Sequence, residues 1–191
     1  MFAHPDTIDI KLKQILLQEV LARTFLLSKS DTTYTYFKSG SSEGGLRGYM
    51  NVQENFSKSI IDSCNLEIKK IMTELGLNIQ EFAYARHFLG VNTPGAWVAP
   101  HTDTIEFLSA PHDIDIENFR EIRCNFYLQR PDAGGNPCQG DVVLENADNM
   151  GWIFNASKSH HSTPVIGNTN RIVMSLGSVV RIDKLKDLNL L

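Results

Sequence analysis

The spacing of apolar residues changes from a helical period to a strand period near Glu81, and this change limits the folds that the chain can adopt. Before it, residues 6–27 and 52–75 have apolar side chains three and four positions apart, which is the spacing of amphipathic helices. Gly76 follows the second helix as a C′ glycine would. After Glu81, apolar and polar residues alternate in short segments. The expected strands are residues 82–88, 96–100, 121–129, 141–145, 151–155, 159–165 and 171–181.

Two helices followed by seven short strands predict a mainly β protein, a jelly roll whose N-terminal helices support one of its sheets. A length of 191 residues is typical of one domain, so we expect residues 1–191 to form a single unit. Within it, residues 1–80 supply the helical support and a loop, and residues 81–181 form the β core. The expected loop covers residues 28–51 and includes a stretch rich in glycine and serine at 39–48.

Composition argues against several kinds of partner. Lys and Arg number 18 against 22 Asp and Glu, so the net charge is −4 and no positive field is available to bind nucleic acid. No apolar stretch is long enough to span a membrane. Three cysteines without zinc-like spacing fit free thiols in a reducing compartment, so we expect the chain to be cytoplasmic.

The clearest strand pattern lies in residues 122–129, where apolar and polar side chains alternate. Ile122, Cys124, Phe126 and Leu128 share one face, which we expect to be buried. The other face carries Arg123, Asn125, Tyr127 and Gln129. This polar set indicates either an ordinary solvated face or the lining of a polar pocket inside the roll.

Two potential metal ligands lie one residue apart after the expected strand at 96–100. Residues i and i+2 of an extended segment share a face, so His101 and Asp103 can reach one ion together. An imidazole with a carboxylate suits Fe(II). A third ligand is available at His160 or His161, but adjacent side chains of a strand point to opposite faces, so only one of the two can bind the same ion.

These elements together resemble the Fe(II)- and 2-oxoglutarate-dependent dioxygenases, in their prolyl-hydroxylase-like or aspartyl/asparaginyl-hydroxylase-like branch. The resemblance covers about residues 82–180 and rests on the His-x-Asp pair, a histidine four residues before Pro164, and an arginine about ten residues further along. It implies a double-stranded β-helix with Fe(II) as cofactor and 2-oxoglutarate and O₂ as cosubstrates. The metal ligands that it implies are His101, Asp103 and His160, with His161 as the alternative to His160.

The resemblance also implies a cation that holds the far carboxylate of 2-oxoglutarate. Arg171 is the candidate, since a guanidinium can bind a carboxylate through two parallel hydrogen bonds. Tyr127 matches the family's tyrosine that assists at this carboxylate. Some relatives instead use an arginine on the central strand, so Arg123 is the competing candidate and Asn125 is its helper.

We therefore expect an oxygenase that hydroxylates a C–H bond of a small polar substrate, such as an amino acid or a derived metabolite. The metal centre is the expected catalytic group, with no separate acid or base. A short chain without an accessory peptide-binding domain favours a small molecule over a polypeptide, and residues 39–48 and 104–118 are candidates for loops that close over it. The alternatives are a peptidyl, prolyl-type hydroxylase and a cupin-like metal protein without 2-oxoglutarate chemistry. The sequence makes no prediction of the oligomeric state.

Overall fold

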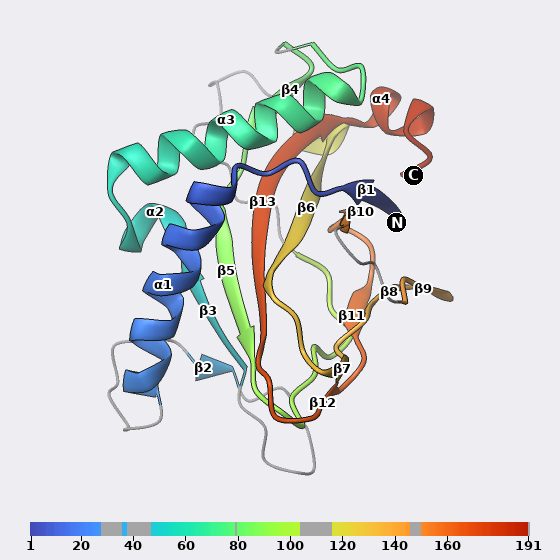
Figure 1. Cartoon of the computed structure of the whole chain (residues 1–191). Coiled ribbons are helices and arrows are strands. Elements are labelled where there is room, and N and C mark those ends of the chain that lie inside the picture. Colours follow the sequence, from blue (N-terminus) through green and yellow to red (C-terminus); the bar gives the residue numbers. More distant parts are fainter. Residues whose placement is uncertain (28–35, 38–46, 79, 104–115, 146–149, 191) are drawn as a thin grey trace.

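The computed structural model of the chain describes residues 1–27, 36–37, 47–78, 80–103, 116–145 and 150–190. Two long helices lie against one face of a large antiparallel sheet, and short strands lie beyond its other face (Figure 1). The prediction of a mainly β jelly roll with supporting N-terminal helices is confirmed. Within the described residues, no helix has the length and apolar character needed to cross a membrane.

The large sheet is built around two long strands, β6 (Phe119–Gln129) and β13 (Arg171–Arg181), which pair antiparallel. β10 (Met150–Asn155) pairs with β6, and β5 (Phe88–Asn92) pairs with β13. The other strands of this sheet are β1 (Phe2–Pro5) on β10, β3 (Arg47–Asn51) on β5, β2 (Tyr36–Phe37) on β3 and β4 (Phe82–Tyr84) on β13. The order β1-β10-β6-β13-β5-β3-β2 therefore places the two long strands at the centre.

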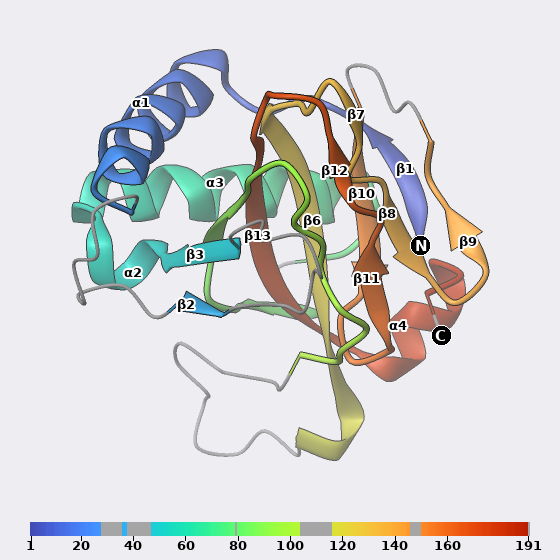
Figure 2. The same ribbon diagram turned by 90° about the horizontal axis from the view of Figure 1, so that it is seen from below.

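Two smaller sheets, in the orders β11-β8-β9 and β12-β7, lie on the opposite side of the large sheet from the long helices (Figure 2). Their strands are β7 (Ala133–Gly134), β8 (Pro137–Gln139), β9 (Val142–Val143), β11 (His160–Ser162) and β12 (Val165–Ile166). A 3₁₀ turn, η1 (Ile116–Asn118), precedes β6, and a short helix, α4 (Ile182–Asp187), follows β13.

Both predicted helices are present, with different bounds. α1 (Ile10–Leu27) begins later than expected because the Asp9 carboxylate accepts a hydrogen bond from a backbone N–H of the first turn, 2.9 Å away, as an N-cap. The second helix is divided into α2 (Val52–Asn55) and α3 (Lys58–Glu74), since the two residues between them have extended backbone. Gly76 adopts the predicted left-handed conformation after α3, with φ 83°.

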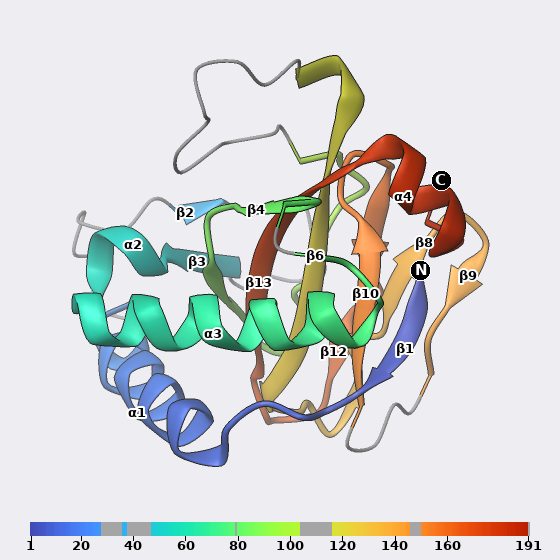
Figure 3. The same ribbon diagram turned by 90° about the horizontal axis from the view of Figure 1, so that it is seen from above.

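The apolar face of β6 packs against the long helices. Ile122, Cys124 and Phe126 are fully buried in the same core cluster as side chains from α1 and α3. In Figure 3, α3 runs across the sheet on this side. The predicted alternation of β6 is therefore confirmed, and its polar residues face the smaller sheets.

The expected strand at residues 96–100 is wrong. Pro100 has no N–H to donate to a ladder. The segment instead lies beside β11 and is joined to it by individual hydrogen bonds. Val98 and Ser162 share two of these bonds, and His101 and His160 exchange two backbone hydrogen bonds as an isolated bridge. The segment nevertheless runs extended up to the His-x-Asp pair, which it places against β11.

Other expected strands are shorter or divided. The strand at 82–88 becomes β4 and β5. The strand at 159–165 becomes β11 and β12, because Pro164 between them lacks an N–H, and only β9 remains of 141–145. The expected loop at 28–51 was wrong where β2 and β3 form, since β3 pairs with β5 over its whole length. Most of the two stretches at 39–48 and 104–118 lies outside the described residues.

His87 is a fully buried histidine between α3 and β13. Its Nδ1 accepts a hydrogen bond from Gly177 N–H at 3.1 Å, so its Nε2 carries the proton that Asn65 Oδ1 accepts at 2.9 Å. Burial, with the nearby charge of Arg123, lowers the pKa of His87 to about 3. The imidazole is therefore neutral in the folded protein.

Acid should destabilise the protein through His87. Below a pH of about 6.5 the unfolded chain binds a proton at this residue that the folded chain does not bind. The free energy of unfolding should therefore fall by an extra ~1.4 kcal/mol per pH unit as the pH decreases from 6.5 toward 3. Denaturant titrations between pH 7 and 4 measure this slope, and His87→Gln should have a shallower slope. Equal slopes for the two proteins would show that His87 does not contribute.

Candidate active site

A cavity of about 740 Å³ lies between the polar face of the large sheet and the strands that cover it. Its wall comes from the segment that ends at Asp103 and from β8 and β11. Its floor consists of side chains that alternate along the strands and pair across them in rows. From one end to the other, these rows are Arg47–Asn92–Arg171, Tyr49–Gly90–Val173, Asn51–Phe88–Ser175–Asn125–Trp152, and Arg123–Phe154.

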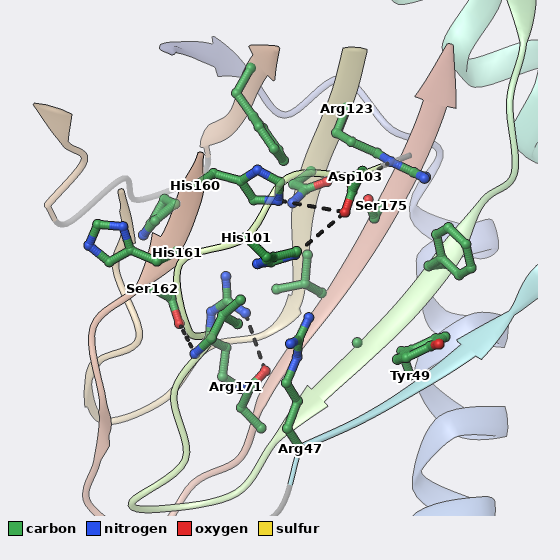
Figure 4. Close-up of a pocket in the computed structure, with 18 of the residues that line it drawn as sticks. Arg47, Tyr49, His101, Asp103, Arg123, His160, His161, Ser162, Arg171 and Ser175 are labelled. Carbon is green, nitrogen blue, oxygen red and sulfur yellow. Dashed lines mark hydrogen bonds and ion pairs between the residues drawn. The ribbon is translucent and has the colours of Figure 1, made fainter. Parts of the chain in front are cut away.

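Three of the predicted ligands converge in this cavity (Figure 4). The ligand atoms of His101, Asp103 and His160 all lie within 4.8 Å of one another. Asp103 Oδ1 is 3.5 Å from His101 Nε2 and 3.9 Å from His160 Nε2. Two imidazoles and one carboxylate on one side of an ion leave its other side open, as in non-haem Fe(II) sites.

Backbone hydrogen bonds set the tautomer of both histidines. Nδ1 of His101 lies 2.8 Å from the Ala99 carbonyl, and Nδ1 of His160 lies 3.0 Å from the Lys158 carbonyl. A carbonyl oxygen only accepts, so each Nδ1 carries a proton, and in the neutral ring Nε2 is the atom with the free lone pair. Burial lowers the pKa of His160, which favours the neutral ring there. Nε2 is therefore the atom that each histidine offers to a metal.

Arg123 holds the carboxylate of Asp103. Its Nε lies 3.5 Å from Asp103 Oδ2, and its side chain is 5% exposed. Burial alone would raise the pKa of Asp103, but the positive charge of Arg123 helps to lower it. Arg123 also forms an ion pair with the buried Glu121 and donates to the Arg86 carbonyl. With these partners it is a buried positioning residue, and it does not lie on an ordinary solvated face, which was one of the two interpretations of this strand.

Arg171 enters the cavity from the first residue of β13. It is 6% exposed, and the one hydrogen bond that it donates within the described part of the chain is a long one to Asn92, at 3.5 Å. Its Nε is buried without a hydrogen-bond partner among the described residues. A buried donor without an acceptor is costly, so this guanidinium suits an anion that enters the cavity.

A glycine makes room for Arg171. Gly135 has φ +64°, and a Cβ at this position would lie 2.7 Å from Cδ of Arg171. The guanidinium beyond it lies 5.7 Å from the Tyr127 ring and 5.5 Å from the Trp152 ring. These aromatic faces hold the cation without neutralising its charge.

Tyr127 and Asn125 differ in what they offer to the cavity. The Tyr127 hydroxyl donates to the Gly135 carbonyl at 3.3 Å, and Tyr127 is not among the described residues that line the cavity. Asn125 does line it, and its Oδ1 is buried without a hydrogen-bond partner among the described residues. The side chain of Asn125 is therefore available to a ligand, whereas the Tyr127 hydroxyl is already used.

His161 lies apart from the three convergent ligands. In Figure 4 its ring is on the other side of β11 from His101 and Asp103. This is the geometry expected of adjacent residues on a strand. The sequence analysis preferred His160 to His161, and the structure places His160 with the other two ligands.

The sequence analysis missed Arg47, a polar residue of the cavity floor on β3. The signal that could have found it is the alternation of Arg47, Tyr49 and Asn51, which is the period of a strand with one face toward a pocket. The neighbouring glycines led us to predict a loop instead.

The architecture and the site together define a jelly roll with a facial two-histidine, one-carboxylate arrangement. No family model matches the chain, and no curated protein matches its sequence. Solved structures do match it. A viral collagen prolyl hydroxylase from Paramecium bursaria Chlorella virus-1, in complex with 2-oxoglutarate, is 11% identical with a TM-score of 0.57, and 94% of each chain is covered.

Two further structures have a similar likeness. A prolyl-4-hydroxylase from Pseudomonas putida is 14% identical, with a TM-score of 0.56 and coverage of 94% of this chain and 91% of that one. HygX from Streptomyces hygroscopicus, with nickel, 2-oxoglutarate and hygromycin B bound, is 10% identical, with a TM-score of 0.56 and coverage of 93% and 81%. The chain therefore has the fold of the Fe(II)- and 2-oxoglutarate-dependent oxygenases.

Proposed function

We propose that this protein is an Fe(II)- and 2-oxoglutarate-dependent oxygenase that uses O₂ to hydroxylate a C–H bond. The observation that carries the proposal is the convergence of His101, Asp103 and His160 in a cavity that also contains the buried Arg171, which has no ion-pair partner among the described residues. The donor set fits Fe(II), because both Nε2 atoms are unprotonated and the carboxylate is ionised beside them. The buried Nε of Arg171 fits the far carboxylate of 2-oxoglutarate.

When bound, Fe(II) with 2-oxoglutarate and O₂ supplies the oxidising chemistry that breaks a substrate C–H bond. The residues of the chain hold and orient the reactants. Arg123 fixes the Asp103 carboxylate, and the Phe154 ring, 4.7 Å from the His160 ring, fixes that imidazole. Arg171 is proposed to orient the 2-oxo acid, with Asn125 as a further polar contact. Trp152 and Phe154 are largely buried in the cavity and help to exclude water from it.

The proposed substrate is a small polar molecule, such as an amino acid or a derived metabolite. A cavity of about 740 Å³ has the size of small-molecule sites, which supports this choice. HygX binds hygromycin B, but another neighbour is a collagen prolyl hydroxylase, so a peptidyl hydroxylase is the second candidate. A cupin-like protein without 2-oxoglutarate chemistry would have no use for Arg171. Three buried free cysteines support a reducing compartment, and we propose the cytoplasm.

Anaerobic addition of Fe(II) and 2-oxoglutarate should produce the weak visible charge-transfer band of a chelated 2-oxo acid. The band is expected because the three protein ligands would leave two adjacent coordination positions of Fe(II) free for the 2-oxo acid. Absorption spectroscopy measures the band, and apo protein with 2-oxoglutarate alone is the control. A folded protein without the band would contradict the proposed function.

Succinate release then identifies the substrate class. Amino acids, metabolites, peptides and methylated oligonucleotides are tested in parallel for stimulation of 2-oxoglutarate turnover. We expect stimulation by a small molecule. Stimulation by peptides alone would favour the peptidyl hydroxylase, and stimulation by oligonucleotides would contradict the argument from net charge.

A further inference from the structure

Arg47 lies at the edge of the cavity floor farthest from Arg123. It pairs with Asn92 across β3 and β5, and Asn92 pairs with Arg171 across β5 and β13. Arg47 and Arg171 are therefore at the two ends of one row. Their backbones are separated by two strand spacings, or about 10 Å. In Figure 4 the Arg47 side chain extends from β3 into the cavity, on the same side as Arg171.

No carboxylate of the described residues forms an ion pair with Arg47. Its polar neighbours on the same strand are used elsewhere or are aromatic: Asn51 caps α2 and donates to Glu54, and Tyr49 packs edge-on against Phe88 at 5.7 Å. Burial and the positive charge of Arg171 lower the pKa of Arg47, while the negative charge of Asp103 raises it. Among the described residues, Arg47 is therefore a cation without an ion-pair partner at this end of the cavity.

The other arginines of the cavity, apart from Arg171, already have anionic partners. Arg123 pairs with Glu121, and Arg86 lies 3.6 Å from Glu54. These pairs are neutral overall, so they offer little attraction to a further anion. Arg47 differs from them in having its charge directed into the cavity without a partner among the described residues.

The cofactors of the proposed function leave this charge unbalanced. Fe(II) carries two positive charges and 2-oxoglutarate carries two negative charges, while Asp103 and Arg171 carry one of each sign. These four charges cancel, and Arg47 remains as one positive charge in a partly desolvated site. A reactant with a single negative charge would balance it.

Arg47 and Arg171 reach the cavity from different strands of its floor. The Arg171 guanidinium lies over the rings of Tyr127 and Trp152, which belong to β6 and β10. Arg47 enters from β3, which is separated from β13 by β5. Each guanidinium can therefore bind an anion of its own.

The floor between Arg47 and the metal ligands is open. Gly90 is in the next row, and a Cβ at this position would have no atom within 4 Å. Arg123, which contacts Asp103, lies two rows beyond it. A molecule that reaches from the metal centre to Arg47 can therefore lie over Gly90.

We propose that Arg47 binds a carboxylate of the substrate, so that the substrate class is a small carboxylic acid with one net negative charge. This inference rests on the proposed function, in which Arg171 binds 2-oxoglutarate. Arg47 acts as a specificity-determining residue, because it selects the charged group of the substrate while the C–H bond lies toward the metal centre.

The test compares carboxylic acids with their uncharged amides. The full chain is loaded anaerobically with Fe(II) and 2-oxoglutarate. Acids with one net negative charge, namely short-chain monocarboxylic acids, L-aspartate and L-glutamate, are each titrated beside the matching carboxamide, which for the two amino acids is the side-chain amide. Perturbation of the visible band measures binding. We expect at least one acid to bind about tenfold or more tightly than its amide, as a charge-assisted hydrogen bond would give. Arg47→Gln should reduce this ratio to about twofold or less, and Arg47→Lys should retain part of it.

Arg181→Gln is the matched control, because it removes one positive charge from an exposed ion pair with Asp183. It should keep the wild-type ratio, and Arg47→Gln should keep the wild-type affinity for 2-oxoglutarate, which also shows that this variant is folded. The inference is overturned if no acid is preferred to its amide while the band is present. It is also overturned if Arg47→Gln weakens 2-oxoglutarate as much as Arg171→Gln does. Absence of the band in the wild type would instead overturn the proposed function, and this inference with it.

Discussion

Asp103→Ala should abolish the visible band of the Fe(II) and 2-oxoglutarate complex and lower the Fe(II) affinity by at least ~100-fold. The carboxylate is the anionic ligand of the set and lies within 4 Å of both Nε2 atoms. Losing it removes a direct bond to the metal, and even loss of an outer partner of a metal ligand typically costs 10–100-fold. Equilibrium dialysis with Fe(II) under anaerobic conditions measures the affinity.

The histidines provide the controls for this experiment. His160→Ala should behave as Asp103→Ala does, whereas His161→Ala should retain Fe(II), because its ring lies on the other side of β11 (Figure 4). If His161→Ala loses the metal and His160→Ala keeps it, the two assignments are exchanged. If the band survives an Asp103→Ala, His101→Ala double substitution, the metal site is elsewhere.

Much of the site could be predicted because its residues follow local rules. The His-x-Asp pair lies on an extended segment, so His101 and Asp103 share a face. The backbone of this segment pairs with β11 through two hydrogen bonds between His101 and His160. The alternation of β6 likewise predicted that Arg123 and Asn125 would face away from the core. Both line the cavity.

The rest depends on contacts between distant parts of the chain. β3 pairs with β5, and nothing in residues 47–51 alone indicates that partner, so Arg47 was assigned to a loop. The role of Arg123 could not be read from β6, since its partner Asp103 comes from another segment. The same holds for the Tyr127 hydroxyl, because its acceptor is the carbonyl of Gly135, a residue outside β6 with a left-handed backbone conformation. Local patterns predicted which side chains face the cavity, but not which of them are already paired.

Because Arg123 is paired with Glu121 and Asp103, its substitution should have different effects from substitution of Arg171. Arg123→Gln alone would break the buried ion pair between Arg123 and Glu121, at a cost of about 3–5 kcal/mol in stability. An Arg123→Gln, Glu121→Gln double variant removes both buried charges. It should weaken Fe(II) by about 10–100-fold by releasing Asp103, and it should affect 2-oxoglutarate much less.

Arg171→Gln should raise the Kd of 2-oxoglutarate by a factor of about 30 to several thousand, which corresponds to a loss of about 2–5 kcal/mol. The guanidinium is 6% exposed and has a buried Nε without an acceptor among the described residues, so the far carboxylate would find its charge-assisted partner there. Titration of the visible band with 2-oxoglutarate measures the Kd, and Fe(II) binding should remain close to that of the wild type. Arg181→Gln, which removes an exposed arginine, should leave the Kd unchanged. A larger loss of 2-oxoglutarate affinity in the Arg123 double variant than in Arg171→Gln would show that Arg123 binds the cosubstrate, as in the aspartyl/asparaginyl-hydroxylase-like branch.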